Sequence, residues 1–145
     1  MGLFNIYATF LADASLLLQV AILFILTVGW GFKRRHNYVK HGIIMGIAVA
    51  LHTISIFVVM MPSLMSSTGL FANLLNRLAL TILPHSVLGS IVEILGIYFL
   101  SVWASNRGVS KACFKNKMIM KATVALWVVE LVLGLYIYVL LYLPS

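Results

Sequence analysis

Four long apolar stretches, separated by polar intervals, dominate the hydrophobic pattern of this 145-residue chain. They cover about residues 14–32, 41–61, 83–103 and 118–143, and the first begins at Ala14 or as early as Leu3. A helix that crosses the hydrocarbon core of a bilayer needs about 20 apolar residues. The stretches are continuous and do not alternate as the strands of a membrane barrel do. The pattern predicts an all-α polytopic membrane protein, in which residues 1–145 form a single domain with a four-transmembrane-helix bundle.

A longer interval separates the second and third stretches. The second stretch is expected to end before Pro62, and residues 62–69 (PSLMSSTG) have the composition of a loop. Apolar side chains then recur with helical spacing at Leu70, Phe71, Leu74, Leu75 and Leu78. This spacing predicts a short amphipathic helix in the outer interface of the membrane. Where this helix continues into the third span, Pro84 is expected to mark a break.

The composition supports the same class of protein. Apolar residues make up 63% of the chain and charged residues only 9%, and the mean hydropathy is +1.10. Soluble globular chains carry roughly 45–50% apolar and about 25% charged residues. Soluble enzymes and soluble nucleic-acid modules are therefore excluded, and so is intrinsic disorder, which requires low hydrophobicity.

The positions of the charges predict the topology. Ten basic residues stand against three acidic ones, and nine of the ten lie in or beside the first and third intervals: Lys33, Arg34, Arg35, Lys40, Arg107, Lys111, Lys115, Lys117 and Lys121. Alternate intervals share one side of a membrane, and the positive-inside rule makes that side cytoplasmic. We predict a multi-pass protein of the cell membrane with loops 33–41 and 105–117 cytoplasmic and both termini outside. These loops are expected to contact anionic lipid headgroups, not nucleic acid, and to keep Cys113 reduced.

A few polar side chains lie inside the predicted spans or at their boundaries. A central charge costs about 2.5–3.5 kcal/mol on insertion scales, so such residues are candidates for function. At about 1.5 Å per residue, His52, Glu93 and Glu130 lie near the middle of their spans. Toward the outer boundary lie His85 and Asp13, and His41 lies at the inner boundary. The same spans contain Gln19.

Helical periodicity places these residues on the same faces as small residues. At about 100° per residue, His41, Met45 and His52 share one side of the second span, and His85, Gly89, Glu93 and Gly96 share one side of the third. On the fourth span, one broad side carries Met120, Trp127, Glu130, Gly134 and Tyr138. The row Gly42, Gly46 and Ala50 predicts close approach of another helix. We expect these faces to point into the bundle.

Several kinds of chemistry are compatible with this set. Histidines are the usual axial ligands of haem, so His52 and His85 are candidates for a haem b site. Imidazole and carboxylate ligands suit copper, zinc or iron, so a metal site is predicted from His52, Glu93 and Glu130, or from His85 and Asp13. Buried carboxylates also suit a proton path. Alternatively, these groups hydrogen-bond one another and set the helix register, for example Glu93 or Glu130 with His52.

Motifs of membrane enzymes are missing from the sequence. It has no HExxH, no Walker loop, no GxGxxG and no CxxCH. A metalloprotease, a nucleotide-driven transporter and a covalent c-type cytochrome are therefore not supported, and we predict that the protein is not an enzyme.

Three runs of sequence resemble a family of small four-helix membrane proteins that includes the bacterial cytochrome oxidase assembly factor CtaM. The runs are KHGIIMGIAVA, PHSVLGSIVEILGIY and KNKMIMKATVALWVVELVLGLYIYVLLY, within roughly residues 33–143. They carry His41 with Met45, His85 with Gly89, and Lys117 followed by Leu126, Trp127, Gly134 and Tyr138. Members tend to have a histidine near the start of the last span, where this chain has Lys117. The resemblance therefore supplies no ligand there, nor the residues His52, Glu93 and Glu130.

The resemblance implies a role beside haem–copper respiratory oxidases, in maturation or cofactor delivery. We therefore predict an accessory or assembly protein of a larger membrane metalloenzyme complex, with haem or copper contact through His41 or His85. One alternative is a membrane b-type cytochrome that carries electrons itself through His52 or His85. Another is a purely structural small subunit with no cofactor.

Overall fold

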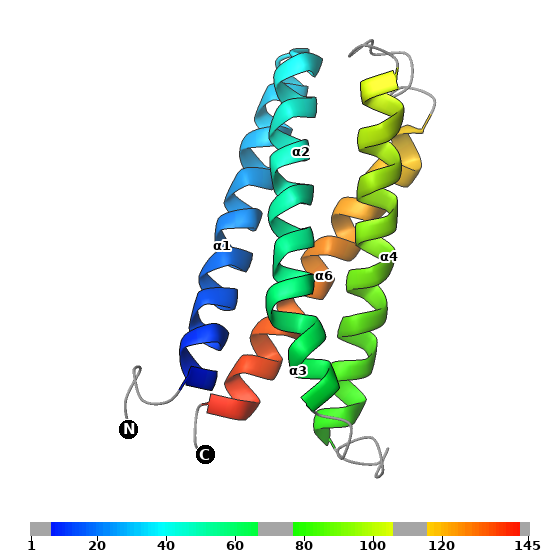
Figure 1. The fold of residues 1–145 in the computed structure, drawn as a ribbon. Helices are drawn as coiled ribbons and strands as arrows, with labels where there is room; N and C mark the ends of the chain where they lie inside the picture. Colours follow the sequence, from blue (N-terminus) through cyan, green and yellow to red (C-terminus); the bar gives the residue numbers. More distant parts are fainter. Residues whose placement is uncertain (1–6, 67–76, 106–115, 143–145) are drawn as a thin grey trace.

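The structure is a computed structural model that describes residues 7–66, 77–105 and 116–142. Its elements are α1 (Tyr7–Arg34), α2 (Tyr38–Ser55), the π-helical turn η1 (Ile56–Met60), α3 (Met61–Ser66), α4 (Arg77–Ser105) and α6 (Lys117–Tyr142). Since α2, η1 and α3 follow one another without a gap, they form one long rod beside three others (Figure 1). The predicted all-α, four-helix bundle is confirmed.

Each rod contains a segment long and apolar enough to cross a membrane. These segments are Ala12–Arg34, Tyr38–Met65, Ala79–Ser105 and Lys117–Leu141. They overlap the four stretches predicted from the hydrophobic pattern, and each extends a few residues beyond at least one predicted boundary. The chain is therefore a multi-pass membrane protein.

Two predicted breaks at proline were wrong. The second span continues through Pro62 to Met65, and α4 runs through Pro84 without interruption. Proline is tolerated within membrane helices because neighbouring groups and local π-helical adjustments satisfy the freed carbonyls. The turn η1 is such an adjustment directly before Pro62. The predicted interfacial helix over 70–78 lies outside the described residues, except that Arg77 and Leu78 belong to the start of α4.

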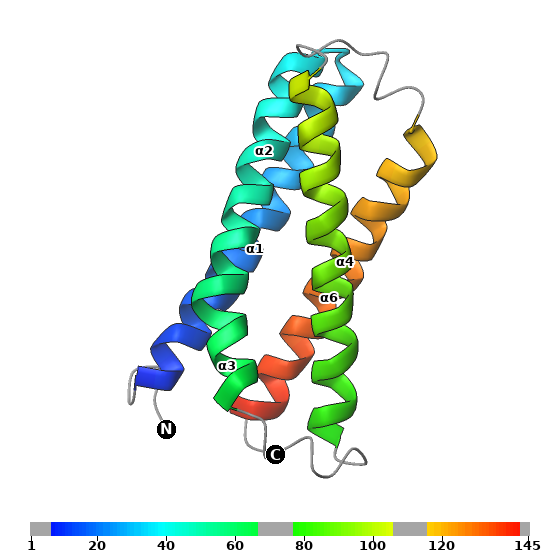
Figure 2. The same cartoon turned by 45° about the vertical axis from the view of Figure 1, so that its right-hand side comes forward.

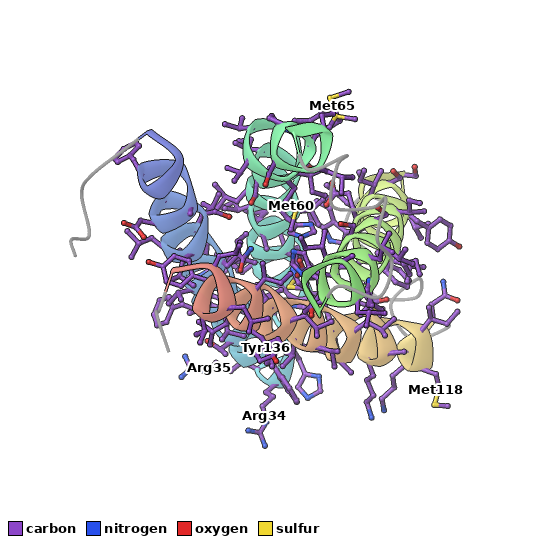
Figure 3. All side chains as sticks on the ribbon, turned by 90° about the horizontal axis from the view of Figure 1, so that it is seen from below. Arg34, Arg35, Met60, Met65, Met118 and Tyr136 are labelled. Carbon is purple, nitrogen blue, oxygen red and sulfur yellow. The ribbon has the colours of Figure 1, made fainter. Side chains whose placement is uncertain are left out.

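Apolar side chains lie both in the core of the bundle and over its outside, whereas the outside of a soluble bundle is polar. Large apolar side chains cover the outside of the helices, with Leu17 71% exposed and Phe24 69% exposed. In Figure 3, Met65 and Met118 point away from the bundle. The buried set, in contrast, includes the polar residues Gln19, His41, His52, Ser55, His85, Thr123 and Glu130. Lipid solvates the apolar exterior, while the polar groups find partners inside.

Small residues allow the helices to approach closely. A Cβ at Gly42 would overlap the Trp103 indole of α4, and a Cβ at Gly46 would lie 3.1 Å from Leu100 of the same helix. The predicted packing role of this row is confirmed for both glycines, but Ala50 is exposed. Residues four apart drift by about 40° around a helix. Ala50 is therefore turned by about 80° from Gly42, away from α4.

One end of the bundle gathers the described basic residues. The end of α1, the start of α2, the end of α4 and the start of α6 lie at this end (Figures 1 and 2). It carries Lys33, Arg34, Arg35, Lys40, Lys117 and Lys121, whereas Arg77 begins α4 at the opposite end. We call it the basic end. This arrangement is the one expected if the two basic intervals share one side of a membrane.

A tight turn joins α1 to α2 at the basic end. His36 has a φ of 57°, in the left-handed region that His adopts more readily than bulky or branched residues. The Asn37 side chain then accepts a hydrogen bond from the Lys40 backbone N–H at 3.3 Å, which caps α2. This turn places His41 near the start of α2, beside Gly29 of α1.

Candidate functional site

The structure separates the predicted site residues into two groups. His52, His85, Glu93 and Glu130 meet in the interior of the bundle, together with Thr53. We call these five residues the polar cluster. His41 lies apart from them, near the basic end, beside a cavity of 730 Å³.

One half of the polar cluster joins α2 to α4. His52 Nδ1 donates to Glu93 Oε2 at 2.8 Å, and Thr53 Oγ1 donates to Glu93 Oε1. His52 is almost fully buried, and the side chain of Glu93 is 12% exposed. The indole of Trp127 covers the His52 ring, with centroids 5.2 Å apart. Both carboxylate oxygens of Glu93 therefore accept hydrogen bonds from two adjacent residues of α2, His52 and Thr53.

The other half brings α6 to α2 and α4 through Glu130. This carboxylate is fully buried, with Oε2 3.8 Å from His52 Nε2 and Oε1 3.5 Å from His85 Nδ1. His85 Nδ1 also donates to the backbone carbonyl of Glu130 at 3.1 Å. Neither carboxylate oxygen of Glu130, nor His52 Nε2, has a hydrogen-bond partner among the described residues. The carboxylate thus lies between two imidazoles without being tightly bound to either.

A small pocket adjoins the polar cluster on the side away from the basic end. It has a volume of 180 Å³, and its lining includes Gln19, His85, Gly134 and Tyr138. A Cβ at Gly134 would lie 2.8 Å from Gln19 Oε1 and 3.0 Å from His85 Cε1, so this glycine makes room for both. Tyr138 donates a hydrogen bond to Asp13 at the same pocket, which joins α6 to α1.

These contacts decide between some of the arrangements predicted for the interior. His52, Glu93 and Glu130 meet as expected, and the hydrogen bond from His52 to Glu93 is of the expected kind. A haem between His52 and His85 is incompatible with the structure, because Glu130 occupies the space between their rings. Asp13 is engaged by Tyr138, not by His85. Across the described residues, no three His, Cys, Asp or Glu side chains are placed to hold one metal ion.

The contact between His85 and Glu130 was not predicted. Counting residues along upright helices placed His85 well toward the outside of Glu130. In the structure α6 is inclined relative to α2 and α4 (Figures 1 and 2), which brings Glu130 to the level of His85. The contact of Thr53 with Glu93 was also missed. The only indication of it in the sequence is that Thr53 follows His52.

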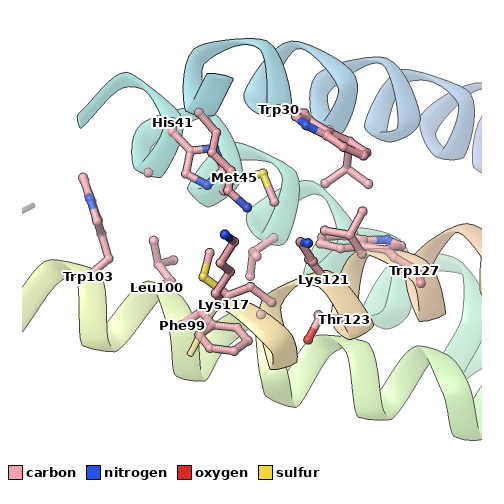
Figure 4. Close-up of a pocket in the computed structure, with 18 of the residues that line it drawn as sticks. Trp30, His41, Met45, Phe99, Leu100, Trp103, Lys117, Lys121, Thr123 and Trp127 are labelled. Carbon is pink, nitrogen blue, oxygen red and sulfur yellow. The ribbon is translucent and has the colours of Figure 1, made fainter. Parts of the chain in front are cut away.

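A large cavity of 730 Å³ lies toward the basic end, between α1, α2, α4 and α6. Its wall is mostly apolar and includes the indoles of Trp30, Trp103 and Trp127. His41 and Met45 face it from α2 (Figure 4). Protein cavities that bind small organic ligands usually measure about 300–1,000 Å³ and are lined by apolar and aromatic side chains. The large cavity has the size and lining of such a site.

His41 presents a free nitrogen at this cavity. Its Nδ1 donates to the Gly29 carbonyl of α1 at 2.8 Å, and its buried Nε2 has no partner within the described residues. With the proton on Nδ1, the lone pair is on Nε2. An imidazole held in this way by a backbone carbonyl has the tautomer and orientation of a metal ligand.

Three lysines give the cavity a positive rim. Lys33 comes from α1, and Lys117 and Lys121 come from α6. In Figure 4 the latter two reach toward His41 and Met45. No acidic residue contributes to the lining of this cavity as far as it is described. The arrangement suits a flat apolar ligand that carries anionic groups at one edge.

Comparison with known proteins adds no further constraint. The chain matches no protein-family model, and no curated protein and no solved structure matches it. The resemblance to the family that includes CtaM therefore stays a prediction.

Proposed function

We propose that this protein is an integral membrane accessory or assembly protein of a haem–copper respiratory enzyme, and that it holds haem b in the large cavity. The observation that carries the proposal is the unpartnered Nε2 of His41, buried at the wall of a 730 Å³ apolar cavity. Together with Met45, His41 also belongs to the first run of sequence that resembles the family including CtaM.

The chemistry of the lining supports haem as the ligand. His41 would hold the haem iron through Nε2, and the indoles would pack against the apolar ring system. Lys33, Lys117 and Lys121 lie where the propionate carboxylates need cations. Bound there, haem would supply an iron centre that accepts and donates single electrons. Met45 adds a thioether, a ligand that suits Cu(I), so copper is the competing occupant in the test below.

A single imidazole favours transfer of the cofactor over permanent electron transport. Among the described residues that line the large cavity, His41 is the only histidine, and Met45 lies one turn away on the same helix. A cytochrome that keeps its haem usually has two strong ligands on opposite faces. His41 alone would hold haem less firmly than two strong ligands, which supports release to a partner enzyme and hence an assembly role.

We also propose that the basic end is cytoplasmic and that both termini are outside. The described basic residues other than Arg77 gather at this end, as the positive-inside rule requires, and they would contact anionic lipid headgroups. Cys113 is the chain's only cysteine and lies in the second basic interval. A membrane-impermeant maleimide should label it in inverted vesicles and not in intact cells. The reverse result would overturn this orientation.

The ligand is tested by the optical spectrum and metal content of the purified protein. We expect a reduced-minus-oxidised haem b band that is lost in His41→Ala and retained in His36→Ala, a matched change at an exposed turn. Copper without a haem band would assign the cavity to the metal. A colourless, metal-free protein that co-purifies with partner chains would establish the structural-subunit alternative. A strain that lacks the protein should accumulate oxidase with incomplete cofactor loading.

A further inference from the structure

We propose that the polar cluster is a proton relay that connects the small pocket to Glu93 in the interior of the bundle. The relay goes beyond the proposed cofactor role and does not depend on any ligand in the large cavity. It rests on a series of titratable groups that face one another from three helices, with the small pocket at the His85 end.

The contacts form a continuous path. His85 lines the small pocket, and its Nδ1 lies 3.5 Å from Glu130 Oε1. The other oxygen of Glu130 lies 3.8 Å from His52 Nε2, and His52 Nδ1 donates to Glu93 at 2.8 Å. Each side chain on the path has a titratable group on both sides, except His85 at the pocket and Glu93 at the inner end.

The loose position of Glu130 distinguishes a relay from a fixed cross-link. Buried polar atoms are nearly always hydrogen-bonded, yet both carboxylate oxygens of Glu130 and His52 Nε2 have no partner among the described residues. The two gaps, 3.5 and 3.8 Å, are each slightly too long for a hydrogen bond. A small movement of Glu130 closes either one. A carboxyl group in this position can take a proton from one imidazole and pass it to the other.

The proton balance closes over four transfers. The Nδ1–H bond of His85 breaks as an O–H bond forms at Glu130 Oε1, and His85 regains a proton at its other nitrogen from the small pocket. The carboxyl group of Glu130 then turns so that the same O–H faces His52, and this O–H bond breaks as an N–H bond forms at His52 Nε2. The Nδ1–H of His52 is transferred to Glu93 Oε2, where Thr53 holds the other oxygen. The net result is one proton moved from the pocket to Glu93, and the reverse sequence releases it.

Among the described residues, the neighbouring helices place no further charged group beside the path from His85 to Glu93. The described groups that face the path are His52 of α2, His85 and Glu93 of α4, Glu130 of α6 and the uncharged Gln19 of α1. Asp13 accepts a hydrogen bond from Tyr138, and the described basic residues other than Arg77 lie at the basic end. Trp127 separates His52 from the large cavity, because its indole lines that cavity and also covers the His52 ring.

Deuterium exchange followed by infrared spectroscopy tests the relay in the ligand-free protein, reconstituted in lipid nanodiscs. A protonated carboxyl group has a C=O stretch that shifts on deuteration. The variants Glu93→Gln and Glu130→Gln assign the bands of the two groups. On mixing with D₂O buffer, we expect His85→Gln, which keeps hydrogen-bonding capacity but cannot relay a proton between two ring nitrogens, to slow exchange of the remaining bands. The slowing should be about tenfold or more, which corresponds to about 1.4 kcal/mol of barrier.

His36→Gln is the matched control, since it changes a histidine at the exposed turn between α1 and α2, outside the path, and should leave the exchange rate unchanged. A second variant, His52→Gln, should slow exchange at Glu93 but not at Glu130, and so keeps the test decisive if His85→Gln does not fold. Wild-type exchange rates in both folded path variants, or no protonated carboxyl band at either glutamate, would overturn the relay. Neither result bears on haem binding at His41.

Discussion

Two buried histidines of the same helix show how differently one residue type is used in this bundle. His52 faces Glu93 with one nitrogen and Glu130 with the other, and Trp127 covers its ring. His41, about three turns earlier on α2, has one backbone partner and directs its other nitrogen at an apolar cavity. The chemistry available to each ring is therefore decided by the neighbouring helices. Carboxylates on both sides suit proton exchange, whereas a free lone pair beside a cavity suits a ligand.

The largest effect on stability should come from removing the imidazole ring of His52. His52→Ala leaves Glu93 and Glu130 buried without the imidazole between them, and we expect the free energy of unfolding to fall by about 3–5 kcal/mol. His41→Ala removes one hydrogen bond and should cost only about 1 kcal/mol. Unfolding measured by steric trapping in bicelles compares the two variants directly. Equal losses would show that the two histidines do not differ in the way described above.

The second largest loss of stability should come from a substitution at Gly42, which packs next to His41. In Gly42→Ala, the new methyl group would push against the Trp103 indole, so we expect a cost of about 1–3 kcal/mol and weaker haem binding. Gly31→Ala is the control, because nothing lies within 4 Å of a Cβ there. That variant should be stabilised by about 0.5–1 kcal/mol through helix propensity. Thermal unfolding together with haem titration of both variants separates a packing effect from a general intolerance of alanine.

The contribution of the Glu93 carboxyl group to the contact between α2 and α4 can be tested by an isosteric change. Glu93→Gln keeps one oxygen that accepts from His52 or Thr53 but removes the carboxylate, so the loss of stability should be about 1 kcal/mol. Glu93→Ala, which leaves both donors unpaired, should cost more. Chemical unfolding of the pair provides the comparison. A glutamine variant as unstable as the alanine variant would mean that the charge, and not the hydrogen bonds, holds α2 to α4.

The smallest effect is expected at the end of the bundle away from the lysines. Tyr138→Phe removes the hydrogen bond to Asp13 that joins α6 to α1. Polar contacts between membrane helices average about 0.6 kcal/mol, and the unfolding free energy should fall by that amount. A loss as large as that of His52→Ala would show that the small pocket, and not the polar cluster, is the main polar anchor of the fold.

The hydrophobic pattern was enough to predict the four spans, because lipid exposure requires continuous apolar sequence. It misplaced the boundaries at Pro62 and Pro84, where proline ends soluble helices but is accommodated within membrane spans. Periodicity also brought His52, Glu93 and Glu130 together. The contact of His85 with Glu130 depends on the inclination of α6, and the large cavity depends on how four helices leave space between them. Neither property is encoded in the spacing along a single helix.

The walls of the large cavity have a consequence for how a ligand arrives. Trp30 and Val128 line the cavity and are nevertheless 60% and 40% exposed, within segments that cross the membrane. The cavity is thus open sideways, toward lipid. A hydrophobic cofactor that partitions into the bilayer would reach it by two-dimensional diffusion at the concentration found in the membrane. Occupancy would then follow the ratio of cofactor to lipid, so diluting a sample with empty vesicles should release the ligand while dilution with buffer should not.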